Sequence, residues 1–577
     1  MNDTKSKASM NRKSSGRPAA MPTAQHPASP QRPPSGSSSM AAAVWLLLLS
    51  CLIGAVLLGC NPPPRPEFKE LSSTASNGES VAETSDESSD LAPAPQPFTE
   101  PWETWQSYYL TGRHIGYSHV QAEPQSDEPD SPIQIVLQDQ VLIRRGPATI
   151  VQRLDQTSLE TRAGDLISFE AELRVGPALT RYEGTVDGGK LTIVTRRGSK
   201  RSTQSIPWNP NYRGLVGLQQ ALLSDPPAVG ETRRLRTLLP VQFAIATIEM
   251  NCQHLASIPM PDGSVQAARE IEVTMQLADG PATQTLVWID DEGNVLKSYT
   301  PGLELVAFDS TREEATAGIV AGADILTATA VEVSGSLTTP EKAKNVGYLV
   351  TPRNTPSDSE TQYAFQSQPG QWSRKTAEGA FQVLVSRDPQ QRIDESFTTS
   401  KLTPSLEDSR TGPLIDSNGT LVKRLAAAST APKDQPLRLA LDLAQTTKSL
   451  VRRTDYTQGF RTASEVARDG SGDCTARSIL LAAMLRSRGI PARVAVGLVY
   501  MPAEDKPRMV FHMWTLAYIE GRWVHLDATL TGGYAPADRI TLGTHHLADG
   551  NEYECVAPVL GIIGQVDIAI LNATYEE

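Results

Sequence analysis

Cysteine is scarce in this sequence, with five residues in a chain of 577. Cys51 and Cys60 lie in an apolar segment near the N-terminus. The others, Cys252, Cys474 and Cys555, are an odd number, so at least one thiol stays free unless it pairs between chains. Cys474 is the natural candidate for that thiol, and a disulfide between Cys252 and Cys555 stays open on the sequence alone.

Positive charge is also in short supply. The chain has 53 Lys and Arg residues against 65 Asp and Glu residues, which gives a formal net charge of −12 at pH 7. An acidic chain without a basic patch argues against nucleic acid as a partner. The length predicts about two to four domains, and the sequence predicts no particular oligomeric state.

A long uncharged apolar run at residues 41–59 follows a basic lead that is rich in Ser and Pro. This order, with a small residue before a cysteine, is typical of a secretory signal. The run Leu57-Leu58-Gly59-Cys60 resembles the bacterial lipoprotein processing motif, and the resemblance implies that Cys60 becomes a lipid-bearing N-terminus. Residues 1–60 are then a signal peptide, and the mature protein is a lipoprotein anchored to a membrane of the cell envelope, outside the cytoplasm. The alternative is an uncleaved anchor, because a run of about this length can span a bilayer.

Residues 61–100 have the composition of a disordered linker. They contain three consecutive prolines at 62–64, then Ser- and Glu-rich runs, then further prolines up to Pro97. Such a segment cannot bury a core and is typical of a tether.

Residues 101–310 are predicted to form an antiparallel β-rich domain. The run at 166–173 has the composition of a strand, and Gly- and Asp-rich turns at 187–189 and 291–294 predict hairpins. Repeated hairpins favour an antiparallel sheet or half-barrel. No nucleophile–base pair occurs there, so the role of this region stays open between spacing, substrate presentation, and lipid or peptide binding. Weaker strand patterns predict a small β module at residues 328–400.

The clearest chemical feature is a cysteine at the predicted start of an apolar helix. Gly472-Asp473-Cys474 precedes a run whose apolar residues repeat at helical spacing, and Gly489 and Pro491 mark its end. A thiol in the first turn faces unpaired backbone N–H groups and the positive end of the helix dipole. Both favour the thiolate, which is the nucleophilic form.

A predicted hairpin supplies two further groups. Residues 510–519 and 522–527 have strand patterns and are joined by a two-residue turn. In that register Asp527 faces Trp514, and His512 lies on the same face of the hairpin, one diagonal step from Asp527. Such diagonal neighbours are about 7–8 Å apart, and their side chains can meet. A carboxylate that orients an imidazole, which in turn pairs with a thiol, is a Cys–His–Asp arrangement for acyl transfer.

These motifs resemble the transglutaminase-like superfamily in its bacterial branch, over residues 434–577. The runs that carry the resemblance are Ser471-Gly472-Asp473-Cys474, Gly489-Ile490-Pro491-Ala492-Arg493-Val494, His512-Met513-Trp514 and Trp523-Val524-His525-Leu526-Asp527-Ala528-Thr529. The resemblance implies a papain-like α+β catalytic domain that follows the β-rich regions. It also implies Cys474 as nucleophile, His512 as base and Asp527 as orienting acid, with no metal and no organic cofactor. His525 departs from the family pattern and adds a second imidazole near the site.

The expected activity is that of a cysteine enzyme that cleaves or transfers acyl groups at amide bonds of a protein or peptide substrate. Hydrolysis is slightly favoured, because nothing in the sequence indicates a dedicated amine site. The alternatives are a cross-linking transglutaminase and a non-catalytic peptide-binding module of the envelope. The backbone N–H of Cys474 is one expected oxyanion donor, and Tyr456 or a neighbouring residue is a candidate for the second.

Overall fold

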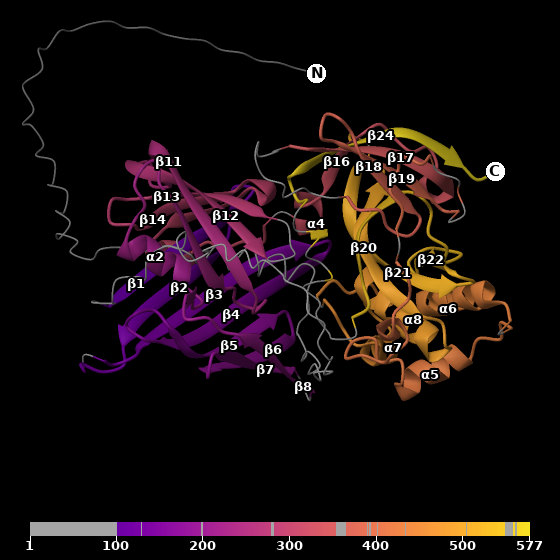
Figure 1. Ribbon diagram of the computed structural model, residues 1–577, viewed down its shortest axis with the longest axis horizontal. Helices are drawn as coiled ribbons and strands as arrows, with labels where there is room; N and C mark the ends of the chain where they lie inside the picture. Colours follow the sequence, from indigo (N-terminus) through magenta and orange to yellow (C-terminus); the bar gives the residue numbers. More distant parts are fainter. Residues whose placement is uncertain are drawn as a thin grey trace, which may run out of the picture. The chain divides into compact units, whose positions relative to one another are not determined.

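The computed structural model in Figure 1 describes residues 101–577 with short gaps, the longest at 354–364 and 548–554. The predicted signal peptide, Cys60 and the 61–100 linker lie outside the described residues. Within the described part of the chain, no helix has both the length and the apolar character needed to cross a membrane.

The first part of the fold is a fifteen-stranded sheet. Its strands are β1 (Trp102–Leu110), β2 (Arg113–Pro124), β3 (Ile133–Arg145), β4 (Ala148–Glu160), β5 (Leu166–Val175), β6 (Ala178–Asp187), β7 (Lys190–Arg197), β8 (Lys200–Pro207), β9 (Tyr212–Arg213), β10 (Thr232–Leu238), β11 (Ile245–Pro259), β12 (Val265–Leu277), β13 (Thr283–Ile289), β14 (Val295–Thr300) and β15 (Leu305–Asp309). The order runs from β8 back to β1, crosses to β15, and runs back to β9. All pairs are antiparallel except β9 with β10.

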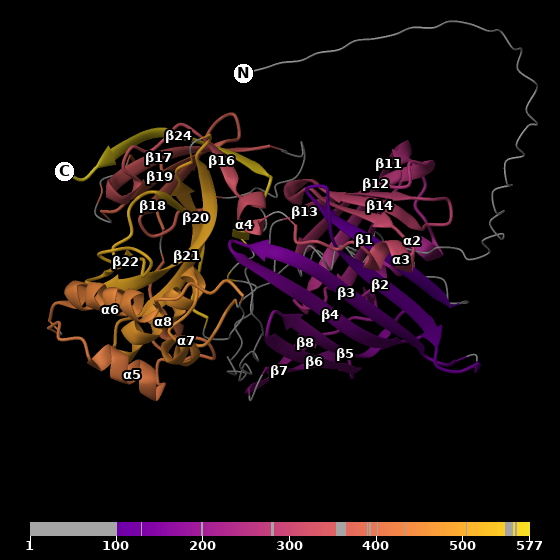
Figure 2. The same cartoon turned by 180° about the vertical axis from the view of Figure 1, so that it is seen from behind.

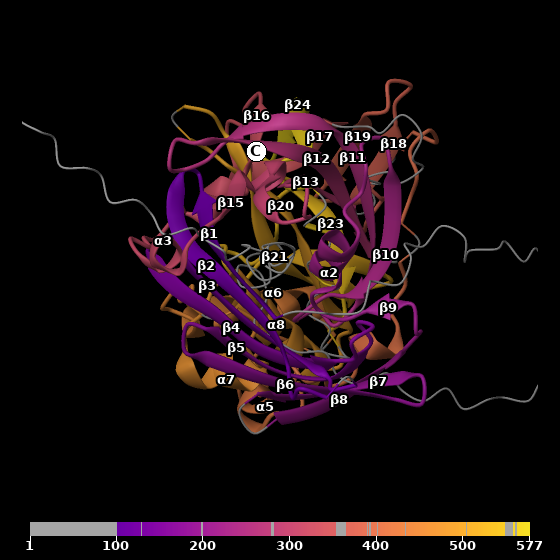
Figure 3. The same ribbon diagram turned by 90° about the vertical axis from the view of Figure 1, so that its left-hand side faces the viewer.

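Alternation of buried and more exposed residues along each strand gives this sheet a buried inner face. In β4 every second residue from Ile150 to Glu160 is buried. The apolar residues of that face form one core together with α2 (Gly217–Ser224), around which the sheet curls in Figure 3. The hairpin predicted at 187–189 is present between β6 and β7, where Gly188 and Gly189 have φ values of 55° and 74°.

The second part of the fold is a nine-stranded sheet with helices. Its strands are β16 (Val331–Ser334), β17 (Ala343–Pro352), β18 (Gln371–Lys375), β19 (Phe381–Ser386), β20 (Ala492–Met501), β21 (Arg508–Ile519), β22 (Arg522–Leu526), β23 (Arg539–His545) and β24 (Val566–Tyr575). The order is β18-β19-β17-β24-β16-β21-β20-β23, and β22 pairs with β21. The short helices α3 (Arg312–Thr316) and α4 (Ile325–Ala328) come between the strands of the two sheets in the chain.

The strands at 331–386 are not the separate small β module that was predicted for residues 328–400. They join the sheet of the C-terminal domain, because β16 pairs with β21 and both β16 and β17 pair with β24 (Figure 2). The sequence pattern showed the strands but not their partners, since the partner β24 lies about 200 residues further along the chain and long-range pairing leaves no local pattern. The region is therefore part of the C-terminal domain's own sheet.

Among the described residues, the helices that accompany this sheet include α5 (Thr420–Ala427), α6 (Pro436–Leu450), α7 (Ala463–Asp469) and α8 (Cys474–Ser487). The sequence predicted one apolar face for α8, whereas the structure buries residues on every side of it. The cause is that α8 shares one core with α5, α6 and α7 and with residues of β20 and β21. The α+β class predicted from the sequence is confirmed by this helix-and-sheet domain after a β-rich one.

Cys252 and Cys555 do not form a disulfide. Cys252 lies in the core of the fifteen-stranded sheet, while Cys555 lies in the core around α8. Cys252 is a free, buried thiol, and burial raises its pKa.

Candidate active site

The local backbone places Cys474 as the first residue of α8. Asp473 is the N-cap, and its Oδ1 accepts from the N–H groups of Thr475 at 3.0 Å and Ala476 at 3.2 Å. Gly472 has φ 150°, and a Cβ at that position would lie 2.3 Å from the Cβ of Ala476. A side chain there would collide with the first turn of the helix. The residues before Cys474 therefore determine where the helix can begin.

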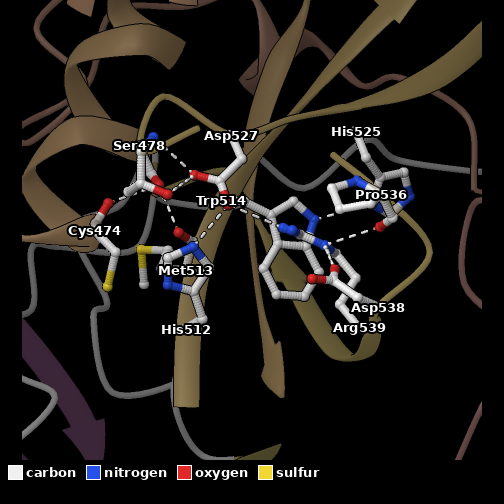
Figure 4. Close-up of polar contacts among 11 residues, drawn as sticks. Cys474, Ser478, His512, Met513, Trp514, His525, Asp527, Pro536, Asp538 and Arg539 are labelled. Atoms are coloured by element: carbon white, nitrogen blue, oxygen red, sulfur yellow. Dashed lines mark hydrogen bonds and ion pairs between the residues drawn. The ribbon is translucent and has the colours of Figure 1, made fainter. Parts of the chain in front are cut away.

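A hydroxyl group ties α8 to the neighbouring strand. The Ser478 Oγ lies 2.8 Å from the carbonyl oxygen of Cys474 and 3.0 Å from that of Met513 on β21. Thr515, also on β21, donates to the Ser478 carbonyl oxygen at 3.1 Å. These contacts, drawn in part in Figure 4, hold the helix that carries Cys474 against the strand that carries His512.

The hairpin of β21 and β22 has the register that the sequence predicted. Ile519 faces Arg522 and Leu516 faces His525. Asp527 follows the last residue of β22, and its Oδ2 lies 2.8 Å from Nε2 of His512. The exposed fraction of the side chain is 17% for His512 and 2% for Asp527, so the pair is largely shielded from water. The structure thus brings the predicted histidine and carboxylate into direct contact.

Opposing effects act on the charge of His512. Burial by itself lowers the pKa of the imidazole, but the charge of Asp527, the interaction with Cys474 and the hydrogen bond to Asp527 raise it to about 10. For Asp527, burial alone raises the pKa, yet His512 and Arg539 bring it well below its usual range. At neutral pH the pair is therefore an imidazolium and a carboxylate. An imidazolium beside a thiol favours the thiolate.

Arg539, a residue that the sequence did not indicate, lies behind the acid. Its Nη1 donates to Asp527 Oδ2 at 3.0 Å, and its Nε donates to Asp538 Oδ1 and the Pro536 carbonyl oxygen, both at 3.1 Å. The side chain is 2% exposed, and the guanidinium lies 5.1 Å from the centre of the Trp514 ring. A buried carboxylate paired with a buried cation stays ionised. Arg539 therefore keeps Asp527 charged and fixes one of its oxygens.

Backbone and hydroxyl groups fix the other oxygen of the acid. Asp527 Oδ1 accepts from the N–H of Thr529 at 2.9 Å and from its hydroxyl at 2.6 Å. Both carboxylate oxygens are thereby held, and the one nearer His512 points at the imidazole. The orientation of His512 follows from this arrangement.

His525, the second imidazole, has different partners. Its Nδ1 accepts from the indole N–H of Trp514 at 2.9 Å, and its Nε2 lies 2.6 Å from the carbonyl oxygen of Pro369, to which it donates. Burial lowers its pKa to about 4, so it is neutral at pH 7. These bonds require one tautomer and tie Trp514 to the chain at residue 369. His525 thus supports the Trp514 side chain, whereas His512 is the histidine that contacts Asp527.

Tyr456, the candidate for a second oxyanion donor, packs against the first sheet. Its ring centre is 5.6 Å from the guanidinium carbon of Arg145, and a Cβ on Gly146 would lie 3.3 Å from the ring. Among the described residues, no group of three His, Cys, Asp or Glu side chains is arranged to hold a metal ion.

Residues 419–528 match the family model described as the transglutaminase-like superfamily. The match covers Cys474, His512 and Asp527 and agrees with the resemblance seen in the sequence. The chain therefore carries a transglutaminase-like domain in its C-terminal part, after the β-rich sheet. No curated protein matches the sequence significantly.

The solved structures that match this chain include three with weak similarity. The periplasmic domain of TgpA from Pseudomonas aeruginosa has 18% identity and a TM-score of 0.22, and the match covers 35% of this chain and 88% of that one. A candidate cysteine protease from Cytophaga hutchinsonii has 14% identity and a TM-score of 0.17, over 40% of this chain and 87% of that one. A β-barrel-like protein from Brucella abortus has 8% identity and a TM-score of 0.28, and the match covers 37% of this chain and 96% of that one. These similarities are too low to support a conclusion about function.

Proposed function

We propose that the protein is a cysteine enzyme that acts on amide or peptide bonds of a protein or peptide substrate, with Cys474 as nucleophile, His512 as base and Asp527 as orienting acid. The 2.8 Å contact between His512 Nε2 and Asp527 Oδ2 carries this proposal. It is supported by Cys474 at the start of a capped helix and by the interaction of Cys474 with the imidazole.

The proposed reaction begins with the Cys474 thiolate and the His512 imidazolium. The sulfur attacks the carbonyl carbon, and a C–S bond forms while the carbonyl oxygen becomes an oxyanion. The N–H of Cys474 is the proposed donor to that oxyanion, because Asp473 accepts the next two N–H groups instead. The C–N bond then breaks, His512 gives its proton to the leaving amine, and a thioester remains on Cys474.

Hydrolysis completes the favoured version of the cycle. His512, now neutral, accepts a proton from water as the water oxygen attacks the thioester. The carboxylic acid product leaves, and the thiolate and imidazolium are restored. In the alternative, a primary amine takes the place of water and the product is a cross-linked amide. Asp527, held by Arg539 and Thr529, keeps the imidazole in place throughout.

Substitution of the cysteines tests the assignment. Cys474→Ala is expected to abolish cleavage of a peptide library, and Cys252→Ala is the matched control, since Cys252 is a buried thiol outside the site. Covalent labelling with iodoacetamide near pH 7 should be lost in the first variant and kept in the second. Full cleavage by purified Cys474→Ala would exclude the proposed nucleophile. A labelled Cys474 with no cleavage and no amine transfer on any library would favour the non-catalytic binding module.

We further propose that the enzyme is a lipoprotein anchored to the envelope through Cys60. The support is the run Leu57-Leu58-Gly59-Cys60 after an uncharged apolar segment. Mass spectrometry of the mature N-terminus extracted from membranes is expected to give a chain that begins at Cys60 with an attached lipid. A chain that still begins before Ala41 would show an uncleaved anchor instead.

A further inference from the structure

The turn between β3 and β4 of the first sheet reaches the helix that carries the nucleophile. Arg145, the last residue of β3, donates from Nη2 to Asp473 Oδ2 at 2.7 Å, across a separation of 328 residues in the chain. The side chains are 6% and 2% exposed. Asp473 therefore uses one oxygen to cap α8 and gives the other to a cation from the β-rich sheet.

The guanidinium of Arg145 is held by several neighbours. It lies over the ring of Tyr456, and its Nη1 donates to the Tyr456 carbonyl oxygen at 3.5 Å. The N–H of the next residue, Gly146, donates to both oxygens of Asp324 at 3.0 Å. Asp324 in turn caps α4. The turn is thus held by Asp324 on one side and by Tyr456 of the C-terminal domain on the other.

Other parts of the first sheet contact the segment between α6 and α7, which precedes Cys474 in the chain and contains Tyr456. Arg197, at the end of β7, donates to the carbonyl oxygen of Phe460 at 2.9 Å. A Cβ on Gly176, in the β5–β6 turn, would lie 3.1 Å from the carbonyl oxygen of Thr457. The chain between α6 and α7 is therefore held by the first sheet near residues 456, 457 and 460.

The charges at the start of α8 explain what Arg145 contributes. A buried carboxylate directly before Cys474 disfavours a second negative charge, which the thiolate would be. A buried cation bonded to that carboxylate cancels most of its field, and removal of one partner leaves an uncompensated charge. The helix N-terminus and the imidazolium of His512 then determine the state of the sulfur.

We infer that Arg145 is a positioning residue which the β-rich sheet supplies to the active site, and that it neutralises Asp473 so that Cys474 is held as a thiolate. The inference rests on the proposed function of Cys474. It assigns to the first sheet a part in the chemistry, in addition to any role in spacing or binding. An enzyme lacking this sheet would keep Cys474, His512 and Asp527 but lose the cation that offsets the cap.

Arg461 contacts the chain just before Asp473, since its Nη1 donates to the carbonyl oxygen of Ser471. The other charged groups of the site are His512 on β21, Asp527 after β22 and Arg539 on β23. None of them is changed in the test. A shift of the pH profile can then be ascribed to the Arg145–Asp473 pair.

The test measures the rate at which iodoacetamide alkylates Cys474 as a function of pH, on the full chain. Peptide mapping distinguishes Cys474 from Cys252 and Cys555. Arg145→Gln is expected to slow alkylation at pH 7 by about tenfold or more and to move the midpoint to higher pH, as a nearby like charge does. Asp473→Asn keeps a good cap and should react at least as fast as the wild type. The double variant should recover the rate of Asp473→Asn.

Two controls separate charge from folding. Arg144→Gln, on the exposed neighbour of Arg145, should change nothing. Arg145→Lys keeps the charge and should stay close to the wild type, which keeps the inference testable if Arg145→Gln folds poorly. An unchanged pH profile in Arg145→Gln would overturn the inference, as would a double variant as slow as Arg145→Gln. If wild-type Cys474 is itself unreactive near pH 7, the proposed function fails and this inference fails with it.

Discussion

Replacing His512 with alanine is expected to suppress the reactivity of Cys474, whereas replacing His525 should leave most of it. In the wild type the imidazolium next to the thiol favours the thiolate, so alkylation should be fast near pH 7. The pKa of His512 is raised to about 10, so the imidazolium that favours the thiolate is present throughout the neutral range. Without His512 the thiolate loses its cationic partner, and alkylation at pH 7 should fall by about an order of magnitude or more.

Turnover should respond more strongly than alkylation in the His512→Ala variant. General acid–base catalysis contributes about 10²- to 10⁴-fold to rates, and this variant lacks the group that we propose gives the leaving amine its proton. The pH-dependent rate of alkylation and the kcat of peptide cleavage are the two measurements. We expect both to fall in His512→Ala, with the larger loss in kcat.

His525 variants provide the matched comparison. His525 bonds to Trp514 and to the Pro369 carbonyl oxygen, so its loss should cost stability by about 1–3 kcal/mol through unpaired buried groups. His525→Asn retains a donor and an acceptor and serves as the milder variant. If alkylation of Cys474 collapses in the His525 variants and survives in His512→Ala, the assignment of the base is wrong.

Replacing Arg539 with methionine is expected to destabilise the fold and to weaken catalysis. The guanidinium is bonded to Asp527 and to Asp538, and its loss leaves two buried carboxylates without their cation. Breaking one buried pair costs about 3–5 kcal/mol. Burial already raises the pKa of Asp538 while Arg539 lowers it, so Asp538 should take up a proton at higher pH in this variant. The free energy of unfolding from denaturant titration is the measurement.

The control for Arg539 is Arg508, at the start of β21, which forms an ion pair with the exposed Asp505. Arg508→Met should change stability by about 1 kcal/mol or less, as surface pairs do. The double variant Arg539→Met/Asp538→Asn should recover part of the loss, because one unpaired charge is removed. Equal stability of Arg539→Met and the wild type would show that the buried network does not hold Asp527.

The pH dependence of stability follows from the same pair of groups. The pKa of Asp527 is lower in the folded protein than in the unfolded one, so its contribution is present above the unfolded value and is lost as the pH falls. The pKa of His512 is raised to about 10, so its contribution is full below the unfolded value and is lost as the pH rises through about 10. The pair therefore stabilises the fold most at pH values between the pKa of Asp527 and the pKa of His512 in the unfolded protein.

Local sequence was sufficient to predict the parts of the site that depend on neighbours in the chain. Asp473 and Gly472 determine where α8 begins, and the two-residue turn at 520–521 sets the register that brings His512 to Asp527.

Contacts from distant parts of the chain could not be predicted in this way. Arg145 is 328 residues from Asp473, and the strands at 331–386 find their partners only in β21 and β24. Arg539 lies 12 residues from Asp527, but no periodicity shows that its side chain turns inward. Buried charges have an environment that only the folded chain defines, and their sequence pattern is the same as that of surface charges.

The central claim is that an acyl group passes through Cys474, and peptide mapping of a trapped intermediate tests it most directly. The protein is mixed with an activated peptide ester, quenched with acid after a short time, digested and analysed by mass spectrometry. We predict an acyl group on the peptide that contains Cys474, absent in Cys474→Ala and long-lived in His512→Ala because deacylation lacks its base. Turnover of the ester with the acyl group on another residue, unchanged by Cys474→Ala, would contradict the mechanism proposed for this protein.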